Sequence, residues 1–196
     1  MKLFNHFTAV GFSNTYLIGP DKGGDAILVD PGTMDVSLLK LIEDHNYYIR
    51  HVLITHAHPN HFRGIKTILK IYDATIYSKV EELEGISCKV LEEGEITLSD
   101  QKIEIISVVG HSFDSLVYRC GHFFFTGDVL SAGRTGTTPD RYTRALLIDE
   151  LENKLFTREG HGILLPGHGP PSTIKAEKNI FIHMNEEYEK QNQSEA

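Results

Sequence analysis

The stretch Thr55-His56-Ala57-His58-Pro59-Asn60-His61 carries the strongest signal in this chain, and it directly follows the apolar run Val52-Leu53-Ile54. Such a run predicts a buried strand, and the loop that leaves it lies at the edge of a sheet. The three imidazoles of this loop can converge on a cation, because alternate residues project in related directions while the loop folds the third back. We therefore interpret the stretch as a metal-binding loop.

Asn60 is the unusual residue of this loop. A carboxylate is expected between the second and third histidines, since a neutral amide oxygen is a much weaker partner for a divalent cation. The number of cations that can bind here therefore depends on this one residue.

Length and composition predict a soluble globular protein. The chain has 196 residues, of which 40% are hydrophobic and 23% charged, so we expect a single domain over 1–196 with a polar tail at about 187–196. A net charge of -8 and the lack of any basic run argue against nucleic acid and anionic membranes as partners. We expect a small-molecule substrate, and a monomer or small homo-oligomer.

The N-terminal residues and the cysteines predict a cytoplasmic location. Residues 1–6 lack the basic segment and apolar stretch of a secretory signal, and no apolar run approaches the roughly 20 residues of a membrane helix. Cys88 and Cys120 lie far apart and outside any CxxC pair, so we interpret them as buried thiols in a reducing compartment.

The hydrophobic periodicity alternates between strand and helix types. In the first half it predicts strands at 3–10, 15–18, 26–29, 49–54 and 74–77, with helices at 35–46 and 62–71. The first three strands suggest an antiparallel meander, and the order from residue 26 onward is βαβαβ. In the second half, from residue 89 onward, the periodicity predicts a second sheet with strands at 89–91, 95–98, 103–109, 116–118, 123–126 and 163–165, and helices at 144–155 and 176–189. We expect an α/β fold in which two mixed sheets pack face to face and are covered by helices outside.

Three later strands each end in a glycine and a potential ligand: Gly110-His111, Gly127-Asp128 and Gly167-His168. A single histidine of this kind is usually an ordinary loop or core residue. Glycine lets the backbone turn sharply, however, so that the next side chain points over the sheet edge. Together with the histidine loop, these strand ends would gather five imidazoles and one aspartate on one rim.

These motifs, together with Asp30 in Val29-Asp30-Pro31-Gly32, resemble the metallo-β-lactamase superfamily in the right order across nearly the whole chain. The resemblance implies an αββα sandwich with a metal centre at the sheet edges. Carried over by motif, His56, His58 and His111 would form a first metal site, the residue at 60 with His61 and His168 a second, and Asp128 would bridge both.

This carry-over implies zinc as the metal, with one or two ions and the first site favoured; iron is an alternative. We expect the second site to be weakened or empty, because Asn60 offers only a carbonyl dipole. The alternative is that Asn60 coordinates adequately through its oxygen. Asp30 either orients a ligand histidine or caps the Pro31-Gly32 turn, and Asp114 is interpreted as a structural residue that tolerates a left-handed turn.

Within the superfamily, the chain is most similar to short single-domain members of the glyoxalase II group. The segments 131–136 and 166–180 carry this likeness, and Arg134 becomes a candidate for contacting a substrate carboxylate, with a structural ion pair as the alternative. The implied function is hydrolysis of small thioesters or related acyl compounds by a metal-bound hydroxide that Asp128 positions. Asn60 cannot act as a base, so we expect this step to be slow.

Two other functions remain open. Persulfide dioxygenases share this fold and hold one iron ion with two histidines and one aspartate, which would here be His56, His111 and Asp128. A non-catalytic metal-binding relative is the third reading, and Asn60 is its only support.

Overall fold

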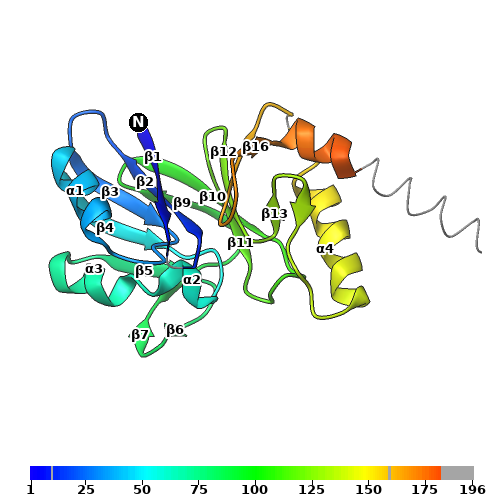
Figure 1. Cartoon of the computed structure of the whole chain (residues 1–196), viewed down its shortest axis with the longest axis horizontal. Coiled ribbons are helices and arrows are strands. Elements are labelled where there is room, and N and C mark those ends of the chain that lie inside the picture. The colour runs from blue at the N-terminus through cyan, green and yellow to red at the C-terminus, as the bar shows by residue number, and fades with distance from the viewer. Residues whose placement is uncertain (10, 159, 182–196) are drawn as a thin grey trace, which may run out of the picture.

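The structure is a computed structural model that describes residues 1–9, 11–158 and 160–181. Two six-stranded sheets pack face to face, and helices lie outside them at the two ends of the molecule (Figure 1). The expected αββα sandwich of two mixed sheets is therefore confirmed.

The first sheet is built from the N-terminal half of the chain, in the order β1-β2-β3-β4-β5-β8. Its strands are β1 Lys2–Thr8, β2 Ser13–Gly19, β3 Gly24–Val29, β4 Tyr47–Leu53, β5 Thr75–Ser78 and β8 Lys89–Val90. The first three strands form the predicted antiparallel meander, although Val10 of the predicted first strand lies outside the described residues. β3, β4 and β5 run parallel and are joined through α1 (Val36–Asp44), α2 (Pro59–Phe62) and α3 (Ile65–Ile71), as the βαβαβ order predicts.

The prediction that residues 89–91 belong to the second sheet is wrong. A small hairpin of β6 (Glu82–Leu83) and β7 (Ile86–Ser87) leads the chain back to the first sheet. There β8 pairs in parallel with β5. The N–H of Leu91 continues this pairing by donating to the carbonyl of Ser78 at 2.8 Å. A strand this short has too little periodicity to reveal its sheet.

The single helix predicted over 62–71 is interrupted, and α2 and α3 are separate. Gly64 lies at the break, where its N–H donates to the carbonyl of Pro31 at 2.9 Å. A Cβ at this position would lie 2.5 Å from the same carbonyl, so only glycine allows the approach. This contact ties the segment after the histidine loop to the Asp30-Pro31-Gly32 turn.

The second sheet is built from the C-terminal half, in the order β16-β15-β12-β11-β10-β9. Its strands are β9 Gly94–Leu98, β10 Gln101–Ser107, β11 Leu116–Cys120, β12 Phe123–Gly127, β15 Ile163–Pro166 and β16 Ser172–Thr173. A separate hairpin of β13 (Leu130–Ser131) and β14 (Arg134–Thr135) leaves this sheet after β12.

Two helices cover the outer face of the second sheet. α4 (Arg141–Lys154) begins three residues earlier than predicted, because the Asp140 carboxylate caps it by accepting from the N–H groups of Tyr142 and Thr143. Residues 174–181 are helical, whereas 182–189 of the predicted C-terminal helix lie outside the described residues. None of the described helices combines the length and apolar character that a bilayer crossing requires.

The core has three layers, because alternate residues of each strand face opposite sides. Tyr16 and Ile18 of β2 pack between the sheets with Tyr118 and Phe125 of the second sheet. The intervening Leu17 packs instead toward the helices of the first sheet. Ile106, Val117, Phe124 and Leu164 of the second sheet pack against Leu147 and Leu151 of α4. Each fully buried Leu or Ile stabilises the fold by about 1.5–3 kcal/mol, and these layers fix the strand ends that carry the site.

Candidate metal centre

Four strand ends bring together all six histidine and aspartate residues expected to bind metal. His56, His58 and His61 follow β4, His111 follows β10, Asp128 follows β12 and His168 follows β15. Their ligand atoms form two groups, and within each group these atoms lie within 4.8 Å of one another. The first group is His56, His58, His111 and Asp128, and the second is His61, His168 and Asp128.

The first group has three imidazoles around a compact space. His58 Nδ1 lies 2.8 Å from His56 Nε2 and 3.2 Å from His111 Nε2. One oxygen of Asp128, Oδ2, lies 3.8 Å from His56 Nε2 and 3.9 Å from His111 Nε2. Three nitrogens and a carboxylate oxygen in this arrangement are a donor set suited to zinc or to ferrous iron.

The second group depends on both oxygens of Asp128. Its Oδ1 lies 3.4 Å from His61 Nε2, and its Oδ2 lies 3.5 Å from His168 Nε2. His61 Nε2 and Asp128 Oδ1 are both buried, and neither has a hydrogen-bond partner in the part of the chain that the structure describes. Buried polar atoms of this kind are normally satisfied, so their orientation toward one space fits a bound cation.

The other ring nitrogen of four ligand histidines is held by the protein. His111 Nδ1 lies 2.8 Å from the carbonyl of Thr137, and His168 Nδ1 lies 2.8 Å from the carbonyl of Phe12. His56 Nδ1 lies 3.0 Å from Thr55 Oγ1. His61 Nδ1 lies 3.1 Å from Asp30 Oδ2. Such contacts fix the ring and leave Nε2 free for a metal, which is the usual arrangement around metal-binding histidines.

Asp30 holds the start of the histidine loop as well as His61. Its Oδ1 accepts from the N–H of Thr55 at 2.8 Å, and its Oδ2 accepts from the Thr55 hydroxyl at 2.7 Å. In the Pro31-Gly32 turn, the N–H of Gly32 donates to the backbone carbonyl of Asp30, so the side chain of Asp30 does not cap this turn. Asp30 has a φ of 51°, a region that costs a non-glycine residue energy, and the contacts of its side chain hold it there.

Burial and the surrounding carboxylates set the charges of the ligands. Burial, followed by neighbouring His61, lowers the pKa of His56 to about 2, so this ring is in the neutral form that binds a cation. Burial also disfavours the charged form of His61, but Asp30 and Asp128 outweigh it and raise its pKa to about 10. Burial opposes ionisation of Asp128, yet His61 holds the pKa of this carboxyl well below its usual range. A cation at His61 therefore has to displace a proton.

Two of the strand-end glycines are required by close approach. A Cβ at Gly167 would lie 2.5 Å from both Asp128 Oδ1 and His61 Cε1. Gly127 has a φ of 50°, and a Cβ there would lie 2.5 Å from Thr55 Oγ1. These glycines let β12 and β15 bring their ligands against the histidine loop.

Asn60 lies on α2, and its side chain faces the turn between β1 and β2. A Cβ at Gly11 would lie 2.7 Å from both Cγ and Oδ1 of Asn60. The backbone carbonyl of Asn60 accepts from the Ser13 hydroxyl at 2.8 Å. The amide thus lies against the same turn whose Phe12 carbonyl holds His168.

Asp114 contacts the histidine loop, which the sequence does not reveal. Its Oδ2 accepts from the N–H of Ala57 at 2.7 Å, between His56 and His58, and the residue is only 3% exposed. Asp114 does not have a positive φ, so it does not adopt the left-handed turn conformation that the sequence suggested. A carboxylate three residues after His111 was the only sequence signal for this contact.

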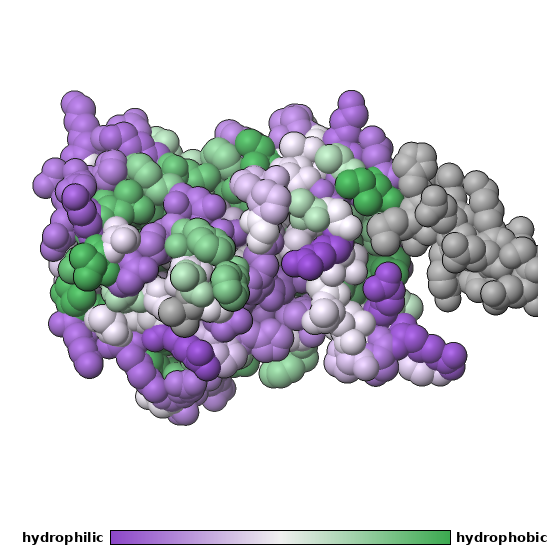
Figure 2. Space-filling model, in the orientation of Figure 1, coloured by the Kyte–Doolittle hydropathy of each residue, from purple (hydrophilic) through white to green (hydrophobic). Residues whose placement is uncertain are grey.

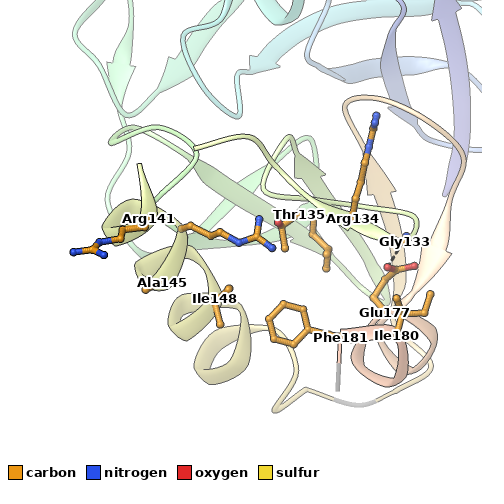
Figure 3. A pocket seen from close by; sticks show the side chains of 11 residues that line it. Gly133, Arg134, Thr135, Arg141, Ala145, Ile148, Glu177, Ile180 and Phe181 are labelled. Atoms are coloured by element: carbon orange, nitrogen blue, oxygen red, sulfur yellow. Dashed lines mark hydrogen bonds between the residues drawn. The ribbon is translucent and has the colours of Figure 1, made fainter. Parts of the chain in front are cut away.

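Arg134 lies in the β13–β14 hairpin and is exposed. It forms no ion pair or hydrogen bond with any residue that the structure describes, so the structural ion pair is not found there. Figure 3 shows its side chain pointing away from Ile148 and Phe181. The hairpin itself is held by Glu177, whose Oε2 accepts from the N–H of Gly133 at 2.8 Å and whose Oε1 accepts from the Ser172 hydroxyl.

Comparisons with known proteins agree with this geometry. The sequence profile of the metallo-beta-lactamase superfamily matches residues 8–86. A hydroxyacylglutathione hydrolase of Buchnera aphidicola subsp. Baizongia pistaciae is 32% identical over 132 residues, covering 66% of this chain and 53% of that protein. A probable metallo-hydrolase of Streptococcus pyogenes serotype M6 is 25% identical, covering 93% of this chain and 91% of that protein.

The fold has a close counterpart among solved structures. The crystal structure of ETHE1 from Myxococcus xanthus superposes with a TM-score of 0.82 at 26% identity, covering 95% of this chain and 90% of that one. The chain spans about half the length of the hydroxyacylglutathione hydrolases that it matches. The matching sequence profile and the shared fold show that the chain belongs to the metallo-beta-lactamase superfamily, with the hydroxyacylglutathione hydrolases among its distant homologues.

Proposed function

We propose that the chain is a metal-dependent hydrolase of small thioesters or related acyl compounds, similar to glyoxalase II. The observation that carries this proposal is the pair of ligand groups that share Asp128. The fixed second nitrogens of their histidines support metal binding. The relatives named hydroxyacylglutathione hydrolase and probable metallo-hydrolase support the class of reaction.

The donor atoms fit divalent cations, and zinc is the metal that we propose, with the first group favoured. His56, His58, His111 and Asp128 would hold one ion, and His61, His168 and Asp128 would hold a second. A bound zinc ion would lower the pKa of a water molecule and polarise the carbonyl of an acyl substrate.

Asp128 and Asn60 have different roles at the reacting end of this centre. Asp128 stays ionised, its Oδ2 lies near histidines of both groups and its Oδ1 lies near His61, so it can accept a hydrogen bond from an attacking water and orient it. Asn60 cannot take a proton, because an amide has no basic lone pair at neutral pH. We expect hydrolysis to be slower than with an aspartate at this position, by about 100- to 10,000-fold.

Arg134 supports a substrate that carries a carboxylate. Its guanidinium is exposed and unpaired among the described residues, and its hairpin lies next to the ligands, since a Cβ at Gly136 would lie 3.0 Å from His111 Nδ1. A guanidinium binds a carboxylate through two parallel hydrogen bonds. The net charge of -8 favours a small molecule over nucleic acid as the substrate.

A second candidate function is supported by the composition of the first group. His56, His111 and Asp128 belong to one group, and two histidines with one carboxylate form the facial site of mononuclear non-haem iron enzymes. Asn60 leaves the second group with Asp128 as its only carboxylate. A persulfide dioxygenase-like enzyme with one iron ion would fit both features.

One experiment separates these functions. The chain is purified without chelator, its metal content is measured by mass spectrometry, and it is assayed on a panel of small thioesters that includes lactoylglutathione and for oxygen uptake on glutathione persulfide. We expect zinc and thioester turnover that His111→Ala abolishes. The control is His122→Ala, because His122 is an exposed histidine outside both groups.

Bound iron with persulfide-dependent oxygen uptake would contradict the proposed hydrolase and favour the persulfide dioxygenase-like enzyme. Bound metal without turnover of either kind would indicate the non-catalytic relative, which Asn60 alone favours. Two equivalents of zinc per chain would contradict the expectation that Asn60 weakens the second group.

A further inference from the structure

A cavity of 340 Å³ lies between α4, the β13–β14 hairpin and the helix at 174–181 (Figure 3). Its volume falls in the range of about 300–1,000 Å³ that small-molecule sites occupy. It is separate from the ligand histidines, none of which lines it. Arg134 is the only lining residue to which the functions considered above assign a role, and that residue is not needed for the site argued below.

The walls of this cavity are mainly apolar. Leu130 of the hairpin, Ile148 of α4 and Phe181 of the C-terminal helix line it, and Figure 3 shows Ile148 and Phe181 directed toward one another across it. Ile180 also lines it and is 40% exposed. Figure 2 shows hydrophobic surface at this end of the molecule, beside the described end of the chain. An apolar ligand would remove this surface from water.

The charged residues of the cavity are mostly cationic. Arg134, Arg141 and Arg144 line it, against the single carboxylate of Glu177. Glu177 is buried, and its two oxygens already accept from Gly133 and Ser172, so it offers little to a ligand.

The three arginines differ in what they can offer. Arg141 donates to the Tyr142 hydroxyl at 2.9 Å and lies over the same ring, and Figure 3 shows it directed outward. Arg134 points away from the apolar walls. Arg144 has no ion pair or hydrogen bond from its side chain to any described residue. In a protein of net charge -8, an unpaired guanidinium at an apolar cavity favours an anion.

We propose that this cavity binds an amphipathic carboxylate, with its acyl chain between Ile148 and Phe181 and its carboxylate on Arg144. The chemistry follows from the combination of apolar walls and a guanidinium that has no partner among the described residues, because such a group is free to make a charge-assisted hydrogen bond. The proposal does not depend on the hydrolase activity, because the lining residues and the ligand groups are different sets.

The test is a calorimetric titration of the full-length protein with octanoate and with octanamide, which has the same chain length and no charge. We expect octanoate to bind and octanamide to bind about tenfold more weakly or not at all. Arg144→Gln should weaken octanoate binding by about tenfold and leave octanamide unchanged. Ala145→Leu, which fills the cavity from α4 without changing charge, should weaken both ligands.

The control is Lys40→Gln, which removes one exposed positive charge on α1, far from the lining residues in the fold. It should leave octanoate binding unchanged. Because a carboxylate can also bind a metal ion, methyl chemical shifts locate the ligand: Leu130 and Ile148 should shift, and Ile54 beside the histidine loop should not. No saturable octanoate binding, equal binding by Arg144→Gln, or shifts only around Ile54 would each overturn the proposal.

Discussion

The two ligand groups share Asp128 but differ in exposure and in their dependence on position 60. In the first group His58 is exposed, whereas the side chains of His56 and His111 are only 1% and 5% exposed. In the second group, His61 is fully buried and tied to Asp30. The first group is complete with three histidines and one carboxylate, whereas the second has two histidines and depends on what Asn60 can add. One fold thus offers two neighbouring metal sites of unequal strength.

The largest effect should come from the residue that the two groups share. Asp128→Asn removes the only carboxylate that the described residues give to either group, and it leaves the charge of buried His61 with Asp30 as its remaining carboxylate partner. We expect metal content to fall close to zero and any hydrolysis to fall by at least about 100-fold. Elemental analysis and steady-state kinetics measure both, with Asp149→Asn on the exposed face of α4 as the control. A variant that keeps both metal and activity would show that Asp128 does not bridge the groups.

Asn60→Asp should make the two groups more alike. The new carboxylate would supply a negative oxygen near the second group and a base that the amide cannot provide. We expect the metal content to rise by up to one equivalent per chain and thioester hydrolysis to rise by about 100-fold or more. Titration with zinc followed by kinetics on lactoylglutathione tests both. Unchanged metal content and unchanged rates would count against the role assigned to position 60.

Asp114 variants should weaken the first group alone. Asp114→Ala removes the acceptor for the N–H of Ala57 between His56 and His58, and we expect about 10- to 100-fold weaker metal binding at this group. Asp114→Asn keeps an acceptor oxygen without the charge, so its loss should be smaller. Competition with a chromophoric chelator measures the affinity. Equal losses in both variants would mean that charge, not the hydrogen bond, is what Asp114 contributes.

The smallest expected effect is a pH dependence of the stability of the fold, which does not involve the metal-ligand groups. Glu104 lies on β10; burial raises the pKa of its carboxyl, but the guanidinium groups of Arg158 and Arg119 outweigh this and lower it. A depressed folded-state pKa stabilises the fold above the ordinary value of about 4.3, and this contribution is lost as the pH falls through the folded pKa.

Wild type should therefore lose more stability than Glu104→Gln between neutral pH and pH values below that range. Chemical denaturation at several pH values, with chelator present so that metal does not contribute, gives the comparison. Parallel losses in the two proteins would mean that the ion pairs of Glu104 do not contribute to acid stability.

The sequence predicted the layers of the fold because long, strongly periodic segments dominate them. It failed where tertiary contacts decide. β8 is too short to show which sheet it joins, and Gly64 looks like a tolerated helix glycine until Pro31 is seen against it. In both cases a partner distant in sequence sets the local structure.

The ligand residues were predictable because histidines and an aspartate at strand ends are distinctive, and the structure brings all of them together. Their supports were only partly predictable. Asp30 could be suspected from its motif, but the contacts of Phe12 and Thr137 are made by backbone carbonyls, which every residue carries. No pattern of side chains in the sequence can therefore predict these two contacts.

Those two carbonyls have a consequence for how the site can change. The acceptors that hold His111 and His168 are present whichever side chains occupy positions 137 and 12. Both residues are exposed, and Phe12 presents 69% of its surface to solvent. Substitutions there can therefore change the exposed surface beside the ligands while the imidazoles keep their orientation, although the φ of 53° at Phe12 narrows the choice toward residues that tolerate it, such as asparagine and glycine. The orientation of these two ligands is thus independent of the side chains that form the surface beside them.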